Sequence, residues 1–454
     1  MRIADTFAVQ PDPLRRVAYS HYRRALRENP AATAKALRRI AGLCHSRLAR
    51  PALDLMRRAM VSSKLRSLAF ARKSYSLRQR IFPSRRPHGV NLVAYIRAEM
   101  GLGEAGRGMA SVLESAGVPF RVYNFEAGNP SSHANLSWSH KEGSRAEYDV
   151  TLLCVGPDNL ENVRAYLPNR FLNNRYVIAY WFWELPEFPE EWTRGFELVS
   201  EIWAGSGFVQ ESVALKSPAP VVRVPPVVRI GNTRLPRGYF LLPENRFLFL
   251  SACDTFSVLE RKNPLGVIRA YLTAFPREDP RVGLVLKFNN PSDSRLQLEN
   301  ILSLVAGRND IHIINKIFAR DEIDSLIAAC DSVVSLHRAE GFGLVPAEAM
   351  SLGKPVIITA WSGNVDYMTP DNCAAIGYKL VPLGRDYGLY KAHQYWAEPD
   401  LDQAAHWMRR LVEEPGLCLE LGRRAQETMT RGFSPEAVGT TIRKRLEYIR
   451  RNSL

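Results

Sequence analysis

The stretch HRAEGFGLVPAEAM, residues 337–350, places a glycine-rich turn between an apolar run and a run with helical character. The apolar run CDSVVSLH, residues 330–337, predicts a buried strand. Pro346 suits the first turn of a helix, where its missing N–H is not needed, and Gly353, with a proline two positions later, indicates the end of that helix. The stretch therefore predicts a strand, a glycine turn, a helix and then a second strand over KPVIIT, residues 354–359.

This turn brings two kinds of polar group together. The backbone amides of residues 341–345 are expected at a helix N-terminus, which is a favourable place for an anion. Glu340 and Glu348 flank these amides, and their carboxylates would repel an anion unless they bind another part of the ligand. Sugar hydroxyls are suitable partners, so we expect a ligand with both an anionic group and hydroxyls.

The chain has 454 residues, of which 46% are hydrophobic and 10% aromatic, and we expect two or three globular domains. No run approaches the roughly 18 apolar residues that a transmembrane helix needs, and the N-terminal residues lack the apolar region of a signal peptide. The spacing of the cysteines matches no metal site and predicts free thiols in a reducing, cytoplasmic compartment. They lie at positions 44, 154, 253, 330, 373 and 418.

Strand-like and helix-like runs alternate from about residue 88 onward, for example VNLVAYI at 90–96 and EAGRGMASVLESAG at 104–117. This alternation predicts an open, mostly parallel α/β sheet. GNTRLPRGYFLLPEN, residues 231–245, interrupts it and suggests a hinge, after which a second α/β series begins. We expect α/β domains at 88–235 and 236–435, with a last helix at about 436–454 that packs back on the first domain.

Residues 1–87 form a basic extension in which apolar residues recur at helical spacing among arginines. Residues 1–86 hold 21 Lys+Arg and 4 Asp+Glu, a charge of +17, whereas the remaining 40 Lys+Arg and 42 Asp+Glu sum to −2. Two interpretations stay open: a solvated helical face, or a basic amphipathic surface for an anionic membrane. No nucleic-acid partner is expected, because no binding motif accompanies the charge.

GLGEAG, residues 101–106, fits the dinucleotide-binding pattern G-x-G-x-x-G, and Glu126 lies near the place of the acid that binds ribose in such folds. The fit is weakened because RAEM, residues 97–100, separates the expected strand from the first glycine. Three interpretations remain: a nicotinamide site, a turn needed for tight packing, or a loop in which Gly101 and Gly103 face the donor side of an interdomain cleft.

The two glutamates are spaced as E-x7-E within EGFGLVPAEAMSLGKPVI, residues 340–357. Here the sequence resembles the retaining glycosyltransferases of family 4, whose GT-B fold consists of two facing Rossmann-like domains. SLHRAEGFGL, ERKNP, YWFWELPEFP and WAEPD resemble a subgroup that acts in bacterial surface polysaccharide synthesis. The resemblance covers most of residues 90–450. It implies that Glu340 meets hydroxyls of the donor sugar, that Glu348 binds the nucleotide ribose, and that the turn holds the diphosphate through Phe342, Gly343 and Leu344.

The resemblance also implies an Arg and a Lys at the donor diphosphate, because no metal is normally used in this fold. Lys262 of ERKNP matches the Lys, and with Glu340 it is expected to be catalytic. The position of the Arg holds Ala252, which is a departure from the family pattern. Arg261, or Lys287 at the end of the expected strand LVLKF, is a candidate for the second positive charge.

YWFWELPEFP, residues 180–189, lies where many family members carry a His close to the reacting sugar, and this sequence has none there. Trp183 and Glu184 are candidates for acceptor binding, because rings pack on sugar C–H faces and carboxylates accept from hydroxyls. Trp181 shares these possibilities but equally suits a core position. His337 and Arg338, directly before Glu340, are candidates for the donor pocket or for a structural role.

The resemblance implies a cytoplasmic hexosyltransferase that makes surface polysaccharide without metal or cofactor, and the membrane interpretation of residues 1–87 would place it at the inner face of the membrane. The donor is expected to be GDP-mannose first and a UDP-hexose second, and the acceptor a glycan or a lipid-linked glycan. Two alternatives stay open. One is a dinucleotide-dependent oxidoreductase, suggested by GLGEAG, and the other is a non-catalytic glycan-binding protein on the same fold, suggested by Ala252.

Overall fold

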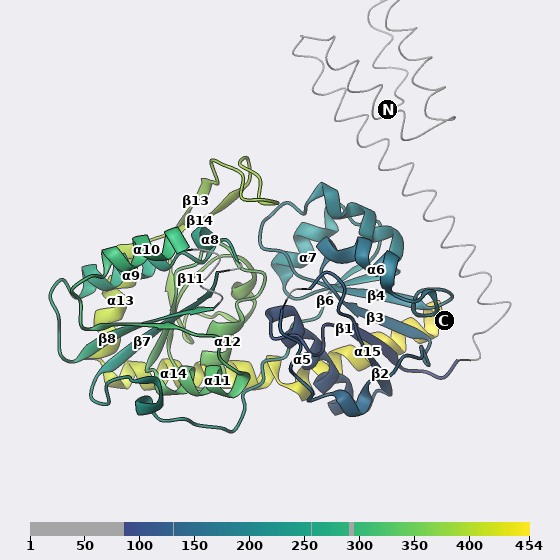
Figure 1. Cartoon of the computed structure of the whole chain (residues 1–454), viewed down its shortest axis with the longest axis horizontal. Coiled ribbons are helices and arrows are strands. Elements are labelled where there is room, and N and C mark those ends of the chain that lie inside the picture. The colour runs from purple at the N-terminus through teal and green to yellow at the C-terminus, as the bar shows by residue number, and fades with distance from the viewer. Residues whose placement is uncertain (1–85, 130, 256, 290–294) are drawn as a thin grey trace, which may run out of the picture. The chain divides into compact units, whose positions relative to one another are not determined.

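The computed structural model describes residues 86–129, 131–255, 257–289 and 295–454 (Figure 1). Residues 1–85, with nearly all of the basic extension, lie outside this range, so its predicted helices stay a prediction. Within the described residues, none of the helices is both long and apolar enough to cross a membrane.

The first half of the described chain forms a parallel sheet of six strands in the order β2-β1-β3-β4-β5-β6. Its inner strands are buried over their whole length, which is why their sequences are continuous apolar runs. The strands are β1 Val90–Ala94, β2 Phe120–Asn124, β3 Val150–Cys154, β4 Tyr176–Trp181, β5 Glu201–Ala204 and β6 Val221–Arg223. The helices are α5 Gly101–Ser115, α6 Leu160–Tyr166 and α7 Gly207–Ala214, with 3-10 turns η1 Ser139–Lys141, η2 Pro157–Asn159, η3 Asn169–Phe171 and η4 Glu190–Leu198.

The second half forms another parallel sheet of six strands, in the order β12-β11-β10-β7-β8-β9. The strands are β7 Phe247–Asp254, β8 Val282–Asn289, β9 Ile311–Asn315, β10 Ser332–Ser335, β11 Val356–Thr359 and β12 Ala374–Ile376. The helices are α8 Leu259–Lys262, α9 Pro264–Ala274, α10 Arg295–Leu304, α11 Arg320–Ala329, α12 Leu344–Ser351, α13 Leu401–Glu413, α14 Pro415–Phe433 and α15 Pro435–Ser453, with 3-10 turns η5 Arg237–Phe240 and η7 Ser362–Tyr367. β13 Tyr378–Pro382 and β14 Tyr395–Pro399 form a separate antiparallel pair.

Two local features differ from what the sequence suggested. The apolar run at 221–228 yields only a three-residue strand, β6, because Pro225 and Pro226 follow and cannot donate to a sheet. The pair β13–β14 was not expected, and it carries the loop 383–394 between its strands.

The strand order of the second sheet reverses at β7. From β7 the chain continues to β8 on one side, whereas β10 lies on the other side of β7. Ligands of open α/β sheets bind at such a reversal, beyond the carboxyl ends of the strands. The segments that leave β7 and β10 here are the ones that carry Lys262 and Glu340.

The last helix, α15, packs against the first half of the chain. Its Ile442 and Ile449 are buried in the same apolar cluster as strand β1. Arg445 of α15 donates two hydrogen bonds to the fully buried carboxylate of Glu201. That carboxylate also accepts from Tyr176 Oη at 2.9 Å and from Trp203 Nε1 at 2.8 Å, so its charge is both paired and hydrogen-bonded.

Candidate active site

The turn between β10 and α12 has the predicted form. Gly343 lies immediately before α12 with φ +83°, a left-handed conformation that favours glycine. Across the described residues, none of the amides of 341–344 donates a hydrogen bond to another group of the chain. They therefore remain available at a helix N-terminus, where an anion is stabilised.

Neighbouring segments hold this turn in place. Gly341 lies against the first half, because its carbonyl accepts a hydrogen bond of 2.7 Å from Ser206 Oγ. Glu340 exchanges backbone contacts with η7: its amide donates to Ser362 Oγ at 2.8 Å and its carbonyl accepts from Gly363 N at 2.9 Å. A Cβ on Gly363 would come within 2.0 Å of the Gly341 carbonyl oxygen, so the close approach requires glycine.

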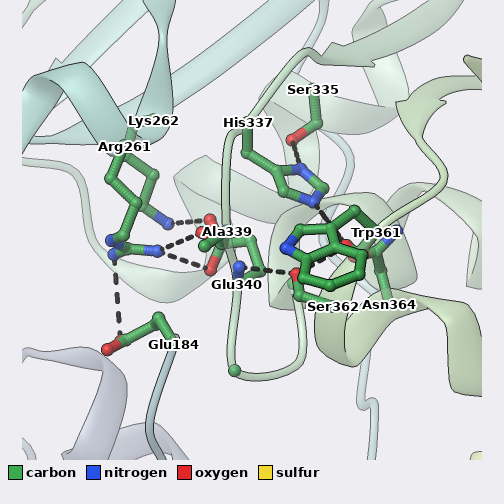
Figure 2. Close-up of polar contacts among 12 residues, drawn as sticks. Glu184, Arg261, Lys262, Ser335, His337, Ala339, Glu340, Trp361, Ser362 and Asn364 are labelled. Atoms are coloured by element: carbon green, nitrogen blue, oxygen red, sulfur yellow. Dashed lines mark hydrogen bonds and ion pairs between the residues drawn. The ribbon is translucent and has the colours of Figure 1, made fainter. Parts of the chain in front are cut away.

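The carboxylate of Glu340 pairs with two cationic side chains, which reach it from the same helix, α8 (Figure 2). Lys262 Nζ donates to its Oε1, and Arg261 Nη1 lies 3.2 Å from its Oε2. Burial alone would raise the pKa of Glu340, but the charges of Lys262 and Arg261 outweigh burial and lower that pKa to about 2. Glu340 is therefore ionised at neutral pH and can accept hydrogen bonds from hydroxyls.

Arg261 links this carboxylate to the first half of the chain. Its guanidinium is buried, donates to the Ala339 carbonyl at 2.7 Å and lies 3.9 Å from the Glu184 carboxylate (Figure 2). Burial would lower the pKa of Arg261, but the negative charge of Glu340 and the neighbouring groups raise it above its usual value. Arg261 therefore stays charged, and it contacts both sides of the site.

Asn263 fixes the direction of the two cations. It has a left-handed backbone, φ +55°, and stands between α8 and α9. Its side chain accepts from Gly266 N at 3.1 Å and donates to the Leu336 carbonyl at 2.9 Å. Lys262, the last residue of α8, is thereby held beside the turn that follows β10.

His337 and Arg338 attach the turn that carries Glu340 to the neighbouring segments of the second domain. The buried His337 ring lies 3.0 Å from Ser335 Oγ and 3.0 Å from Asn364 Oδ1, and burial lowers its pKa (Figure 2). Arg338 donates to both oxygens of Glu398 on β14 and to the Glu260 carbonyl. These contacts favour the structural interpretation of both residues over the pocket-lining one.

Glu348, on α12, pairs with an arginine that the sequence did not single out. Arg320 Nη1 lies 2.7 Å from Glu348 Oε1, and Arg320 also pairs with Asp324. Burial raises the pKa of Glu348, whereas the charge of Arg320 opposes that rise. Arg320 begins α11 after a loop, and nothing in the local sequence indicates that it reaches Glu348.

The other predicted residues of the turn contribute through their backbone. The Phe342 ring is buried against Tyr367, at a centroid distance of 5.1 Å, and against Phe433, at 5.7 Å. Gly343 accepts a hydrogen bond of 2.8 Å from Tyr367 Oη at its carbonyl. Their role in anion binding, through the amides of Phe342, Gly343 and Leu344, stays a prediction.

Lys287 lies beside the position where the family arginine is missing, because Ala252 of β7 and Lys287 of β8 are register partners. Its amine is buried and donates to the Phe288 carbonyl at 3.0 Å and the Lys316 carbonyl at 2.6 Å. Burial lowers the pKa of Lys287 to about 8. Lys287 and Arg261 thus both lie near the reversal in strand order, and the identity of the second diphosphate ligand stays a prediction.

The aromatic residues after β4 pack together. Trp183 is 2% exposed, donates from Nε1 to the Glu187 carbonyl at 2.9 Å, and lies against Trp192 and Tyr390. Trp181 is fully buried against Phe188, as its core interpretation implies. An acceptor would have to uncover the Trp183 ring, whereas the Glu184 carboxylate is 24% exposed.

The glycines of GLGEAG have a packing explanation. β1 ends at Ala94, and Gly101 begins α5, so the strand does not run directly into the first glycine. A Cβ on Gly103 would lie 2.1 Å from the Ala98 carbonyl oxygen, and one on Gly106 would lie 2.8 Å from Ala94 Cβ. Gly101 has open space around it, so packing does not explain this glycine, and its contact with the donor stays a prediction.

Among the described residues, no group of three or more His, Cys, Asp or Glu side chains is arranged to hold a metal ion. The cysteines at 154, 253, 330, 373 and 418 are free thiols.

Residues 257–380, which include Lys262, Glu340 and Glu348, match the family model described as glycosyl transferases group 1. No curated protein sequence matches the chain.

Several solved structures share its fold at low sequence identity. Sucrose-phosphate synthase from Thermosynechococcus elongatus is 14% identical with a TM-score of 0.58, covering 81% of this chain and 100% of that one.

Anabaena HepE in complex with UDP-glucose is 16% identical with a TM-score of 0.55, covering 80% of this chain and 100% of that one. A glycosyltransferase from Rickettsia africae is 14% identical with a TM-score of 0.53, covering 82% of this chain and 100% of that one. Together with the two parallel sheets, these similarities confirm the expected GT-B fold of two Rossmann-like domains.

Proposed function

We propose that the protein is a glycosyltransferase that moves a hexosyl unit from a nucleotide diphosphate sugar to a glycan or a lipid-linked acceptor, with retention of configuration. One observation carries the proposal. The ionised Glu340, paired with Lys262, stands beside the free amides of 341–344 at the N-terminus of α12. The site thus combines a hydroxyl acceptor with anion donors, within the segment that matches the group 1 glycosyl transferase model.

In this mechanism the chain stabilises charge on the leaving group. The amides of 341–344 and the ammonium of Lys262 would receive the donor diphosphate, whose negative charge grows as the glycosidic bond breaks. Glu340 would accept hydrogen bonds from the donor sugar and Glu348 from the ribose. The departing phosphate itself would take the proton of the acceptor hydroxyl, so the mechanism needs no separate general base.

The donor is proposed to be GDP-mannose or a UDP-hexose. Resemblance to polysaccharide-forming enzymes favours the first, and the fold shared with Anabaena HepE, solved with UDP-glucose, supports the second. Arg320 would affect how the ribose of the donor binds, because it forms an ion pair with Glu348. To bind ribose, Glu348 must either give up this ion pair or accept from the ribose hydroxyls while keeping it.

A donor screen tests the proposal. The purified protein is mixed with GDP-mannose, UDP-glucose, UDP-galactose or NADH, and the shift in Tm and the release of nucleoside diphosphate are measured. We expect one nucleotide sugar to raise Tm and to be hydrolysed slowly, and Glu340→Gln to lose hydrolysis. A response to NADH alone would instead support the oxidoreductase alternative.

A non-catalytic glycan-binding protein is the other alternative, and Ala252 is the feature that favours it. The same screen separates it from an enzyme. A binding protein would be stabilised by sugars without releasing nucleoside diphosphate, and Lys262→Ala would leave that stabilisation unchanged.

A further inference from the structure

The loop 383–394 joins β13 to β14 and lies outside the segment that matches the family model, which ends at residue 380. The loop has a defined internal structure. Tyr387 and Tyr390 exchange backbone hydrogen bonds of 2.8 and 3.1 Å around a turn in which Gly388 has φ +60°. Asp386 Oδ1 accepts from Ala392 N at 2.8 Å. This geometry fixes the position from which Tyr390 projects.

Tyr390 contacts the acceptor candidates of the first half. Its hydroxyl donates to Glu184 Oε2 at 2.8 Å, and its ring lies 5.1 Å from the Trp183 ring, between centroids. Two further contacts attach the loop beside them: Gln394 Oε1 accepts from Glu187 N at 3.3 Å, and His393 Nε2 lies 3.0 Å from Glu187 Oε2. The loop is therefore joined to the strand end that carries Glu184 at three separate points.

Glu184 is directed at the reaction centre by the same arrangement. Its Oε2 is bound by Tyr390, while its Oε1 lies 3.9 Å from Arg261 Nη2. Arg261 in turn pairs with Glu340, the proposed ligand of the donor sugar. Burial and the negative charge of Glu184 raise the pKa of Tyr390, so its hydroxyl stays protonated and donates to that carboxylate.

We propose that Tyr390 is a positioning residue that holds Glu184 in the orientation needed for the incoming acceptor hydroxyl. The inference rests on the proposed function. The acceptor class is a sugar hydroxyl, since a carboxylate beside aromatic rings offers an acceptor for O–H groups next to apolar surface. When sugar is absent, water takes the same place.

The test compares Tyr390→Phe with Tyr387→Phe. Tyr390→Phe keeps the ring against Trp183 but removes the hydroxyl that binds Glu184. Tyr387→Phe is the matched control, because this tyrosine lies in the same loop and packs on Trp396 instead. Transfer is measured from GDP-mannose and UDP-glucose to 4-nitrophenyl α-mannoside, to 4-nitrophenyl β-glucoside and to water, together with the affinity for GDP and UDP by calorimetry.

We expect Tyr390→Phe to lower kcat/KM for the sugar acceptor, and the rate of donor hydrolysis, by about five- to tenfold. Nucleotide affinity and Tm should stay close to wild type in both variants, and Tyr387→Phe should transfer normally. In a Glu184→Gln background, Tyr390→Phe should have no further effect, because it acts through that carboxylate.

Three results would overturn the inference: normal transfer and hydrolysis in Tyr390→Phe, an equal loss in Tyr387→Phe, or effects of Tyr390→Phe and Glu184→Gln that multiply. Failure of the proposed function looks different. In that case the wild-type protein itself would turn over neither donor, whatever residue stands at position 390.

Discussion

Glu340 is a buried carboxylate whose surroundings are arranged for its charged form. Isolated burial would favour protonation, yet Lys262 and Arg261 lower its pKa to about 2. Lys262, the more exposed of the two cations, then lies near the amides of 341–344, where a diphosphate is proposed to bind. The Glu340 carboxylate therefore has two effects. It reduces the repulsion between the adjacent charges of Lys262 and Arg261, and its oxygen atoms can accept hydrogen bonds from hydroxyls.

The pH dependence of stability should reveal this environment. The pKa of Glu340 is about 2 in the folded chain against an ordinary 4.5, a difference worth up to about 3 kcal/mol of unfolding free energy. Because the folded pKa is the lower one, this contribution is present above pH 4.5 and is lost as pH falls toward 2. Unfolding by urea at pH 7 and at pH 3.5 should therefore show Glu340→Gln to be less stable than wild type, with a smaller difference at pH 3.5.

The control for that measurement is Glu447→Gln, at an exposed position of α15. Its unfolding free energy should stay within about 0.5 kcal/mol of wild type at both pH values. A difference between Glu340→Gln and wild type that does not change with pH would contradict the lowered pKa.

Lys262 is the cation with the clearest route to a phosphate, since it is only partly buried while Arg261 is enclosed. Lys262→Ala should weaken the binding of GDP or UDP by about ten- to a hundredfold, because a charge-assisted hydrogen bond contributes about 1.5–3 kcal/mol. Titration calorimetry measures this, with Lys379→Ala on the exposed face of β13 as control. Equal affinities in wild type and Lys262→Ala would show that Lys262 does not touch the nucleotide.

The helices and strands that could be predicted from the sequence are those marked by nearby residues, such as an apolar run, a turn glycine or a proline at a helix start. The apolar run of β10, the left-handed glycine and the start of α12 are all encoded within about 20 consecutive residues. The pair β13–β14 was missed because its strands are short and its outward residues include Tyr378, Leu380 and Tyr395, which blur the alternation of a half-exposed strand.

Contacts across the chain could not be predicted from one sequence. Tyr390 and Glu184 are 206 residues apart, and Arg320 reaches Glu348 from another helix. The aromatic run 180–183 shows a further limit. Its composition suits either a sugar platform or a core, and only the 2% exposure of Trp183 distinguishes the two. Burial depends on what the rest of the chain places on top of a residue.

The ion pair between Arg445 of α15 and Glu201 should contribute strongly to the free energy of unfolding. Arg445→Ala would leave the fully buried Glu201 carboxylate without its cation. Removing one partner of a buried ion pair costs about 3–5 kcal/mol, so Arg445→Ala should lower the free energy of unfolding by that order. Arg443→Ala, two residues away and exposed, is the matched control in urea titrations. Equal midpoints for the two variants would show that α15 is not held through Glu201.

At the scale of the whole molecule, the two halves meet at the proposed reaction centre. Ser206 of the first half binds the Gly341 carbonyl, and Glu184 of the first half lies near Arg261. The Ser206 contact ends on the turn of 341–344, so we expect the position of the first domain to affect the proposed anion site. Substitutions at Ser206 are thus expected to alter the site without touching either substrate.

The charge of the molecule is concentrated at one end of its sequence. Residues 1–86 carry +17 and the rest −2. A polybasic surface of this kind is attracted to anionic lipids, at about 1 kcal/mol for each well-placed cation. The competing interpretation is that the arginines are only solvated.

We expect the full chain to sediment with phosphatidylglycerol vesicles at low salt, and a variant that begins at His88 to stay largely in the supernatant. Binding should weaken with salt, because the screening length shortens to about 3 Å near 1 M. Donor-induced Tm shifts should be equal in the two proteins, since every residue proposed to contact the donor, from Gly101 to Glu348, follows His88 in the chain. If both proteins stay in the supernatant, the extension is a solvated surface. If the short variant is insoluble or no longer responds to the donor, the extension instead packs on the catalytic domains, because only a folding role would make the site depend on it.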